Sequence, residues 1–117
     1  LDGVSPADRP TAIMCANDRL AVGVALAAAR LGLSVPQDLS IMGYDDEARI
    51  ADTMVPSLTS MALPLREIGR AAMTKLLDAI EGPGAIEGPD AGKGTNVETM
   101  VPCRLVVRES TGPAPTR

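Results

Sequence analysis

Two short apolar runs, each followed at once by polar residues, constrain the fold of this chain more than any other feature. The runs Thr11–Ala16 and Leu39–Gly43 have the length of buried strands, and the Ala- and Leu-rich stretch Leu20–Leu31 between them is long enough for a helix. A strand, a helix and a second strand form a βαβ unit, whose strands run parallel with a right-handed crossover. We therefore predict an α/β fold with a parallel sheet and flanking helices.

The polar residues after the two runs predict a ligand site. Asn17 and Asp18 follow the first run, and Tyr44-Asp45-Asp46 follow the second. Open α/β sheets bind ligands at the carboxyl ends of their parallel strands, so we expect Asn17 and Asp45 to line one crevice. An amide donates and accepts hydrogen bonds, whereas an ionised carboxylate accepts them from hydroxyls or amines. This pair suits a polyhydroxylated or heterocyclic small molecule such as a sugar, with no cofactor.

Plainer roles compete with ligand binding. Asn17 could cap the first helix, but we expect the adjacent Asp18 to cap it and leave the Asn17 amide free. Asp46 could cap a short helix over 47–53 while Asp45 faces solvent. The two aspartates could also form a metal-binding or phosphoacceptor pair, although a basic partner and further acids are not evident at other strand ends.

The residue inventory argues against an enzyme. The chain has no His and two distant cysteines, so the usual Ser-His-Asp, Cys-His and zinc sites are excluded. We expect Cys15 and Cys103 to be buried free thiols in apolar strands. Residues 88–95 resemble a phosphate-binding loop, but the spacing is one residue short and the flanking helix and strand are reversed. We predict no catalytic residues and no metal site.

From Pro64 onward, the apolar residues recur at the spacing of a helix and no longer at that of a strand. Leu58–Leu63 is typical of an extended segment, either a crossing segment or a short strand. Apolar residues at helical spacing predict a helix over Pro64–Glu81. We expect a Gly-rich loop to Asn96, a last strand within Glu98–Glu109 interrupted at Pro102 near an edge, and a frayed end from Gly112.

The charge of the chain argues against DNA binding. The net charge is −4 and acidic residues outnumber basic ones 15 to 11, so we expect no DNA binding by this chain alone. Even the most basic region, Arg104–Arg108, is predicted to be an apolar strand whose charges flank buried valines.

No apolar run approaches membrane-spanning length, and the sequence begins without Met or signal-peptide features. We expect a fragment of a cytoplasmic protein.

Short motifs then occur in order along nearly the whole chain. They are Pro10-Thr11-Ala12-Ile13, Ala16-Asn17-Asp18, Leu20-Ala21-Val22-Gly23, Gly32-Leu33-Ser34-Val35-Pro36-Gln37-Asp38, Ser40-Ile41-Met42-Gly43-Tyr44-Asp45-Asp46, Pro56-Ser57-Leu58-Thr59-Ser60, Gly69-Arg70-Ala71-Ala72, Leu76-Leu77 and Arg104-Leu105-Val106-Val107-Arg108-Glu109-Ser110. Together they resemble the lactose-repressor/galactose-repressor (LacI/GalR) family of transcriptional regulators.

The resemblance implies the C-terminal part of an effector-binding domain of the type I periplasmic-binding-protein-like fold, with Rossmann-like sheets in two subdomains that close on a ligand. It implies that Asn17 and Asp45 contact the effector, and that Leu65 makes an apolar contact. Residues 64–97 would belong to the N-terminal subdomain. The helix-turn-helix domain would precede this chain and be absent from it.

The resemblance also implies partners. It places a homodimer contact along the first helix and over Ala48–Met54, which would bury Val22, Leu26 and Ile50. DNA would be bound only through the absent N-terminal domain. Leu63-Pro64 stands where the family often has Gln-Pro, which leaves the effector's identity open. A periplasmic sugar-binding component of an ABC transporter is the alternative, since it shares the fold.

Overall fold

The computed structural model describes residues 3–5, 8–81 and 99–114 of the 117-residue chain. These residues form two compact units, one within Leu1–Leu63 and Cys103–Arg117 and the other within Pro64–Pro102. The loop expected over 82–96, which includes the segment resembling a phosphate-binding loop, lies outside the described residues. Each unit is considered by itself below.

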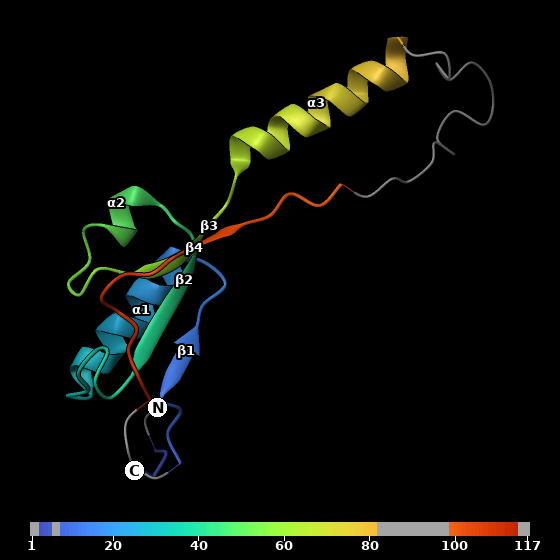
Figure 1. The fold of residues 1–117 in the computed structure, drawn as a ribbon. Helices are drawn as coiled ribbons and strands as arrows, with labels where there is room; N and C mark the ends of the chain where they lie inside the picture. Colours follow the sequence, from blue (N-terminus) through green and yellow to red (C-terminus); the bar gives the residue numbers. More distant parts are fainter. Residues whose placement is uncertain (1–2, 6–7, 82–98, 115–117) are drawn as a thin grey trace. The chain divides into compact units, whose positions relative to one another are not determined.

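A four-stranded sheet organises the first unit (Figure 1). Its strands are β1 (Ala12–Met14), β2 (Ser40–Asp45), β3 (Thr59–Ala62) and β4 (Arg104–Val106), in that spatial order. β2 pairs in parallel with both β1 and β3, and β4 adds to β3 in the antiparallel direction. The predicted βαβ unit and α/β class are therefore confirmed, and the carboxyl ends of three parallel strands meet at one edge of the sheet.

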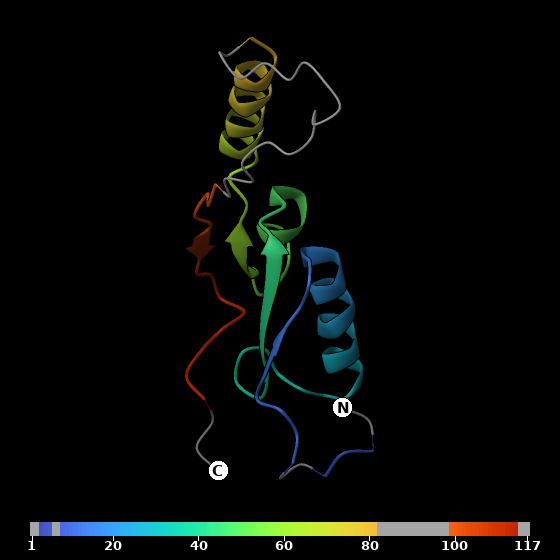
Figure 2. The ribbon, with the colours of Figure 1, turned by 90° about the vertical axis from the view of Figure 1, so that its right-hand side faces the viewer.

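Helix α1 (Asp18–Arg30) connects β1 to β2 and packs along the sheet (Figure 2). Ala21 and Ala28 on its inner side are fully buried, and they face a core without aromatic side chains. The core residues are Cys15, Ala21, Ala28, Leu39, Ile41, Ala51 and Leu58. Because alanine has a small side chain, the helix can approach the strands closely. The helix ends at Arg30 with Leu31 as its C-cap. Gly32 follows with a φ of +69°, which glycine adopts at low cost.

The segment after β4 is tied to the sheet as far as Gly112, the first residue of the predicted frayed end, whereas residues 115–117 of that end lie outside the described residues. The Ile41 N–H donates to the Ser110 carbonyl (2.8 Å), and the Ser110 hydroxyl donates to the Ile41 carbonyl (2.6 Å). The same hydroxyl accepts from the Thr59 N–H (2.8 Å), and the Gly112 N–H donates to the Ser40 hydroxyl (3.1 Å). Ser110, fully buried, thus bridges β2 and the start of β3.

The last strand is also shorter than predicted. It covers only Arg104–Val106, and Val107 is 69% exposed, so the arginines do not flank buried valines as expected. β4 lies at the edge of the sheet, where only one side of the strand is paired. Cys15 is buried, as predicted, but Cys103 precedes this edge strand and is exposed; both thiols are free.

The second unit contains α3 (Leu65–Glu81), which confirms the predicted helix. Its large apolar side chains are exposed: Leu65, Ile68, Met73, Leu76, Leu77 and Ile80. Among the residues that the structure describes, nothing buries these apolar side chains of α3. None of the helices that the structure describes is long and apolar enough to cross a membrane.

Candidate ligand-binding site

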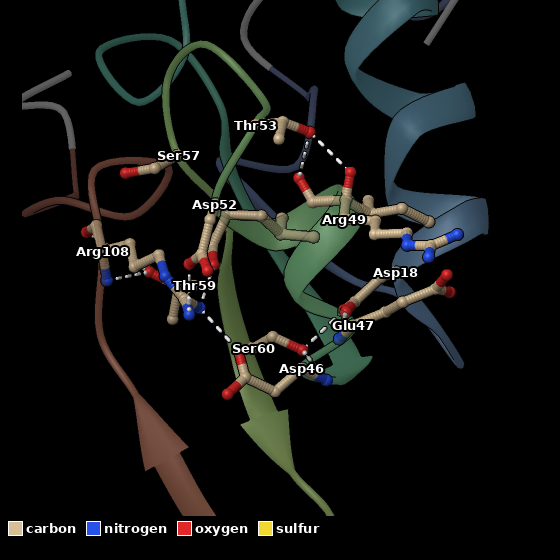
Figure 3. A network of polar contacts seen from close by, with 12 residues as sticks. Asp18, Asp46, Glu47, Arg49, Asp52, Thr53, Ser57, Thr59, Ser60 and Arg108 are labelled. Carbon is tan, nitrogen blue, oxygen red and sulfur yellow. Dashed lines mark hydrogen bonds and ion pairs between the residues drawn. The ribbon is translucent and has the colours of Figure 1, made fainter.

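A buried carboxylate joins the carboxyl ends of the three parallel strands (Figure 3). Asp18, at the start of α1, is only 1% exposed. Its Oδ1 accepts from the Ser60 hydroxyl of β3 (2.5 Å), and its Oδ2 accepts from the Glu47 N–H just after β2 (2.7 Å). Ser60 Oγ in turn accepts from the Asp46 N–H (3.1 Å). A buried charge needs such donors, and the helix N-terminus favours it further. The network fixes the edge of the sheet where a ligand would bind.

Gly43 is required by this network. A Cβ at position 43 would overlap the Asp18 carboxylate and lie 2.9 Å from the Leu58 side chain. The glycine that precedes Tyr44 therefore allows β2 to pass directly beside the buried carboxylate.

Asn17, not Asp18, caps α1. The Asn17 Oδ1 accepts from the Leu20 N–H (2.8 Å), so the predicted capping role of Asp18 is wrong. The reason is tertiary: the Asp18 carboxylate is occupied by Ser60 and Glu47. Capping uses only the Asn17 oxygen, and within the described parts of the chain its side-chain nitrogen has no hydrogen-bond partner. That nitrogen remains a donor for a ligand.

Asp45 stands at the end of β2 with an exposed side chain. Its φ is +108° and that of Asp46 is +55°, so two consecutive non-glycine residues are left-handed. Such backbone is uncommon and often occurs at functional sites. Among the residues described, the Asp45 carboxylate has no hydrogen bond or salt bridge, and it is available to a ligand.

Asp46 pairs with an arginine that the sequence did not point to. The short helix α2 (Ala48–Ala51) has Glu47 at its N-cap and no side-chain cap, so the alternative role of Asp46 as a cap is wrong. Asp46 Oδ1 instead accepts from Arg108 Nη1 (2.7 Å). Arg108 Nη1 also donates to the Leu58 carbonyl (2.9 Å), and Nη2 lies 2.8 Å from Asp52 Oδ1.

The electrostatics of Arg108 reflect these contacts. Burial alone would lower the pKa of Arg108, but the hydrogen bonds and charges of Asp46 and Asp52 outweigh burial and raise its pKa. The sequence predicted Arg108 as the end of an apolar strand whose charges flank buried valines, and no basic partner for the aspartates was evident at other strand ends. The available signal was an arginine that closes the apolar run Leu105–Val107 and is followed by Glu109 and Ser110.

The other predicted site residues, Leu65, Val22, Leu26 and Ile50, all lie on helices. Leu65 is the first residue of α3, is 68% exposed and belongs to the second unit. On α1, Leu26 is exposed and Val22 half-buried, whereas Ile50 of α2 packs partly against the core. Their roles stay predictions. Within residues 3–5, 8–81 and 99–114, no group of three or more His, Cys, Asp or Glu side chains could hold a metal ion.

Residues 2–111 match the family described as the periplasmic binding protein-like domain. The chain is 41% identical over 108 residues to the HTH-type transcriptional repressor CytR of Escherichia coli (strain K12), covering 91% of this chain and 28% of the repressor. It is 41% identical over 105 residues to the HTH-type transcriptional regulator MalR of Streptomyces coelicolor, covering 90% and 28% respectively. The chain thus spans less than a third of the length of these relatives.

Solved structures agree with this relationship. A putative transcriptional regulator of the LacI family from Sanguibacter keddieii superposes with a TM-score of 0.69 at 38% identity, over 95% of this chain and 36% of that one. A LacI family transcriptional regulator from Enterococcus faecium with bound ribose superposes with a TM-score of 0.69 at 32% identity, over 95% and 37%. The chain belongs to the periplasmic binding protein-like domain family, in the form found in LacI-family transcriptional regulators.

Proposed function

We propose that this chain is the C-terminal part of the effector-sensing domain of a LacI-type transcriptional regulator. The effector would be a sugar or a related small molecule. Asp45 carries the proposal: its exposed carboxylate, unpaired among the described residues, stands at the carboxyl end of a central parallel strand, where such folds bind ligands. The ribose bound to the related regulator from Enterococcus faecium supports a small polyhydroxylated ligand.

The chemistry of the two candidate contacts suits such a ligand. An ionised carboxylate at Asp45 accepts from ligand hydroxyls, and the Asn17 side-chain nitrogen donates to a ligand oxygen. Both side chains follow parallel strands that are neighbours in the sheet. Binding of this kind needs neither a cofactor nor a catalytic group, so we infer a sensor and not an enzyme. The apolar ligand contact that the family resemblance implies for Leu65 stays a prediction.

We further infer that DNA contact lies outside these 117 residues. The net charge of −4 opposes binding to a phosphate backbone. Effector binding would control the operator only if the effector had different affinities for two arrangements of the domain. A regulator of this kind would act in the cytoplasm, as a homodimer. The transporter alternative shares the domain type, but the relatives described above are regulators.

Calorimetry on the complete gene product tests the role of Asp45. The titrants are ribose, sucrose, cellobiose and adenosine, which sample sugars and a heterocyclic ligand. For a titrant that binds, Asp45→Ala should weaken affinity roughly 10- to 150-fold, because a hydrogen bond to a charged group is worth about 1.5–3 kcal/mol.

Asp8→Ala is the matched control, since Asp8 is also exposed but lies in the N-terminal loop. It should leave the affinity unchanged. Equal affinities for wild type and Asp45→Ala would show that Asp45 does not contact the ligand. Failure of all four titrants to bind the folded wild-type protein would contradict the proposed ligand class.

A further inference from the structure

The turn that carries Asp45 adopts an unfavourable backbone conformation. Asp45 and Asp46 both have positive φ, at +108° and +55°. Left-handed backbone at two successive non-glycine residues costs free energy and persists only where the surroundings hold it. The direction in which the Asp45 side chain leaves β2 depends on these two angles.

Within the described residues, the turn is held by contacts of Asp46 and of the following Glu47 N–H, whereas the Asp45 carboxylate makes none. The Asp46 N–H donates to Ser60 Oγ (3.1 Å), and Asp46 Oδ1 accepts from Arg108 Nη1 (2.7 Å). The second contact joins opposite charges, so it is the stronger of the two. One residue of the turn is therefore anchored, while the carboxylate of its neighbour stays exposed.

Arg108 is itself fixed by contacts on every side. Its N–H donates to Thr59 Oγ1 (2.9 Å), its Nη1 also reaches the Leu58 carbonyl (2.9 Å), and its Nη2 lies 2.8 Å from Asp52 just after α2. Its side chain is only 17% exposed. Figure 3 shows the guanidinium between the C-terminal segment, β3 and the acidic residues on either side of α2. A group held this way can restrain the turn.

We propose that Arg108 is a positioning residue for the ligand site: through Asp46 it holds the Asp45–Asp46 turn left-handed and so sets the direction of the Asp45 carboxylate. Any effect of this positioning on ligand binding rests on the proposed function. The effect on the turn itself does not depend on any ligand.

Hydrogen exchange in the complete gene product, without ligand, tests the effect on the turn. Arg108→Met keeps an unbranched side chain but removes the charge and the donors. Exchange at the amides of Asp46 and Glu47 should become faster by about tenfold, as expected for loss of one charge-assisted hydrogen bond. Exchange at Val24, in the middle of α1, should not change. Unchanged exchange at Asp46 and Glu47 would overturn the proposal.

Two further variants separate positioning from general stabilisation. Glu109→Gln alters the neighbouring residue of the same segment, whose carboxylate binds Ser57, and should leave Asp46 exchange unchanged.

In an Asp46→Gly background, where glycine adopts positive φ at low cost, Arg108→Met should not accelerate Glu47 exchange further. An equal acceleration in that background would contradict a role through Asp46. If Arg108→Met does not fold, Asp46→Asn tests the same ion pair and should open the turn.

Ribose binding provides the ligand measurement. Where wild type binds ribose, Arg108→Met should weaken binding, and it should add little to the loss already caused by Asp45→Ala. Fully additive losses would overturn the positioning role. If wild type does not bind ribose, that result counts against ribose as the ligand, and the exchange measurements still decide whether Arg108 positions the turn.

Discussion

Adjacent polar residues at the start of α1 have different roles. Asn17 caps the helix through its oxygen, whereas the buried Asp18 carboxylate joins β3 and the turn after β2. Either residue type can cap a helix, so local sequence does not distinguish them. The distinction comes from Ser60 and Glu47, which approach Asp18 only in the folded chain.

The cap at Asn17 gives a prediction about stability. Asn17→Ala should lower the free energy of unfolding by about 1 kcal/mol, because the Leu20 N–H loses its acceptor. Asn17→Asp keeps a capping oxygen and should retain most of the stability, while it replaces the ligand-facing nitrogen by an oxygen. Urea unfolding of both variants measures the difference. Equal stability of wild type and Asn17→Ala would show that the cap is unimportant.

Two glycines of the same unit should respond in opposite ways to alanine. Gly43→Ala should destabilise the protein by about 1–3 kcal/mol, since the added methyl group overlaps Asp18 and approaches Leu58. Gly23→Ala places a methyl group in open space on the exposed side of α1 and should stabilise it by about 0.5–1 kcal/mol. Thermal unfolding distinguishes the two. A neutral Gly43→Ala would contradict the close approach of β2 to the carboxylate.

Among the elements, the segment after β4 joins parts of the sheet that are distant in sequence. Ser110 bonds to both β2 and β3, Arg108 holds the turn after β2, and Glu109 contacts the loop before β3. This irregular segment bonds partly through its backbone, as between the Ser110 carbonyl and the Ile41 N–H, and partly through side chains that satisfy groups a regular strand would pair through its backbone. Its contribution to the fold therefore depends on polar side chains as well as on the backbone.

Glu109 makes part of that contribution dependent on pH. Hydrogen bonds from the Ser57 N–H (3.1 Å) and hydroxyl (3.0 Å) lower the pKa of Glu109 from its ordinary value of 4.5. A lowered folded-state pKa stabilises the protein above the unfolded-state pKa, and this stabilisation is lost as the pH falls through the folded-state value. The melting temperature of wild type should therefore exceed that of Glu109→Gln at pH 7.

The difference between the two melting temperatures should shrink as the pH falls below about 4.5, because the protonated carboxyl group then resembles the amide. Ser57→Ala removes one of the two donors and should show a smaller pH dependence. Melting curves between about pH 3 and pH 7 measure this trend. A difference that stays constant across the range would exclude Glu109 as its source.

At the scale of the whole molecule, exposed apolar residues on α1 support self-association. Leu26 is 63% exposed, whereas Ile50 already packs partly against the core. In a two-fold dimer each side chain in the interface is buried twice. Leu26→Glu should therefore raise the dimer dissociation constant of the complete gene product by at least about tenfold, given about 1.5–3 kcal/mol for each buried leucine.

Leu20→Glu is the control for the dimer contact. Leu20 is also exposed on α1 but lies on another face of the helix, six residues before Leu26. It should leave the dissociation constant unchanged. Sedimentation velocity measures the association. A wild-type protein that stays monomeric at high concentration would contradict the dimer.

The sequence by itself determined the elements and their order. The strand–helix–strand start, the extended segment at Thr59–Ala62 and the long helix α3 were all predicted, and so was the placement of Asn17 and Asp45 after parallel strands. Strands and helices follow from hydrophobic period and from residues a few positions apart, so they can be predicted from short stretches. The direction of parallel strands then places the candidate site at one edge.

Only the tertiary structure decided how the side chains at that edge are used. The partners Arg108 and Asp46 are 62 residues apart, and Ser60 and Asp18 are 42 apart. The exposed Cys103, the capping role of Asn17 and the ordered segment through Gly112 likewise depend on neighbours from elsewhere in the chain. A buried carboxylate or arginine takes whichever donor or acceptor the folded chain brings within about 3 Å, and local sequence carries no information about that choice.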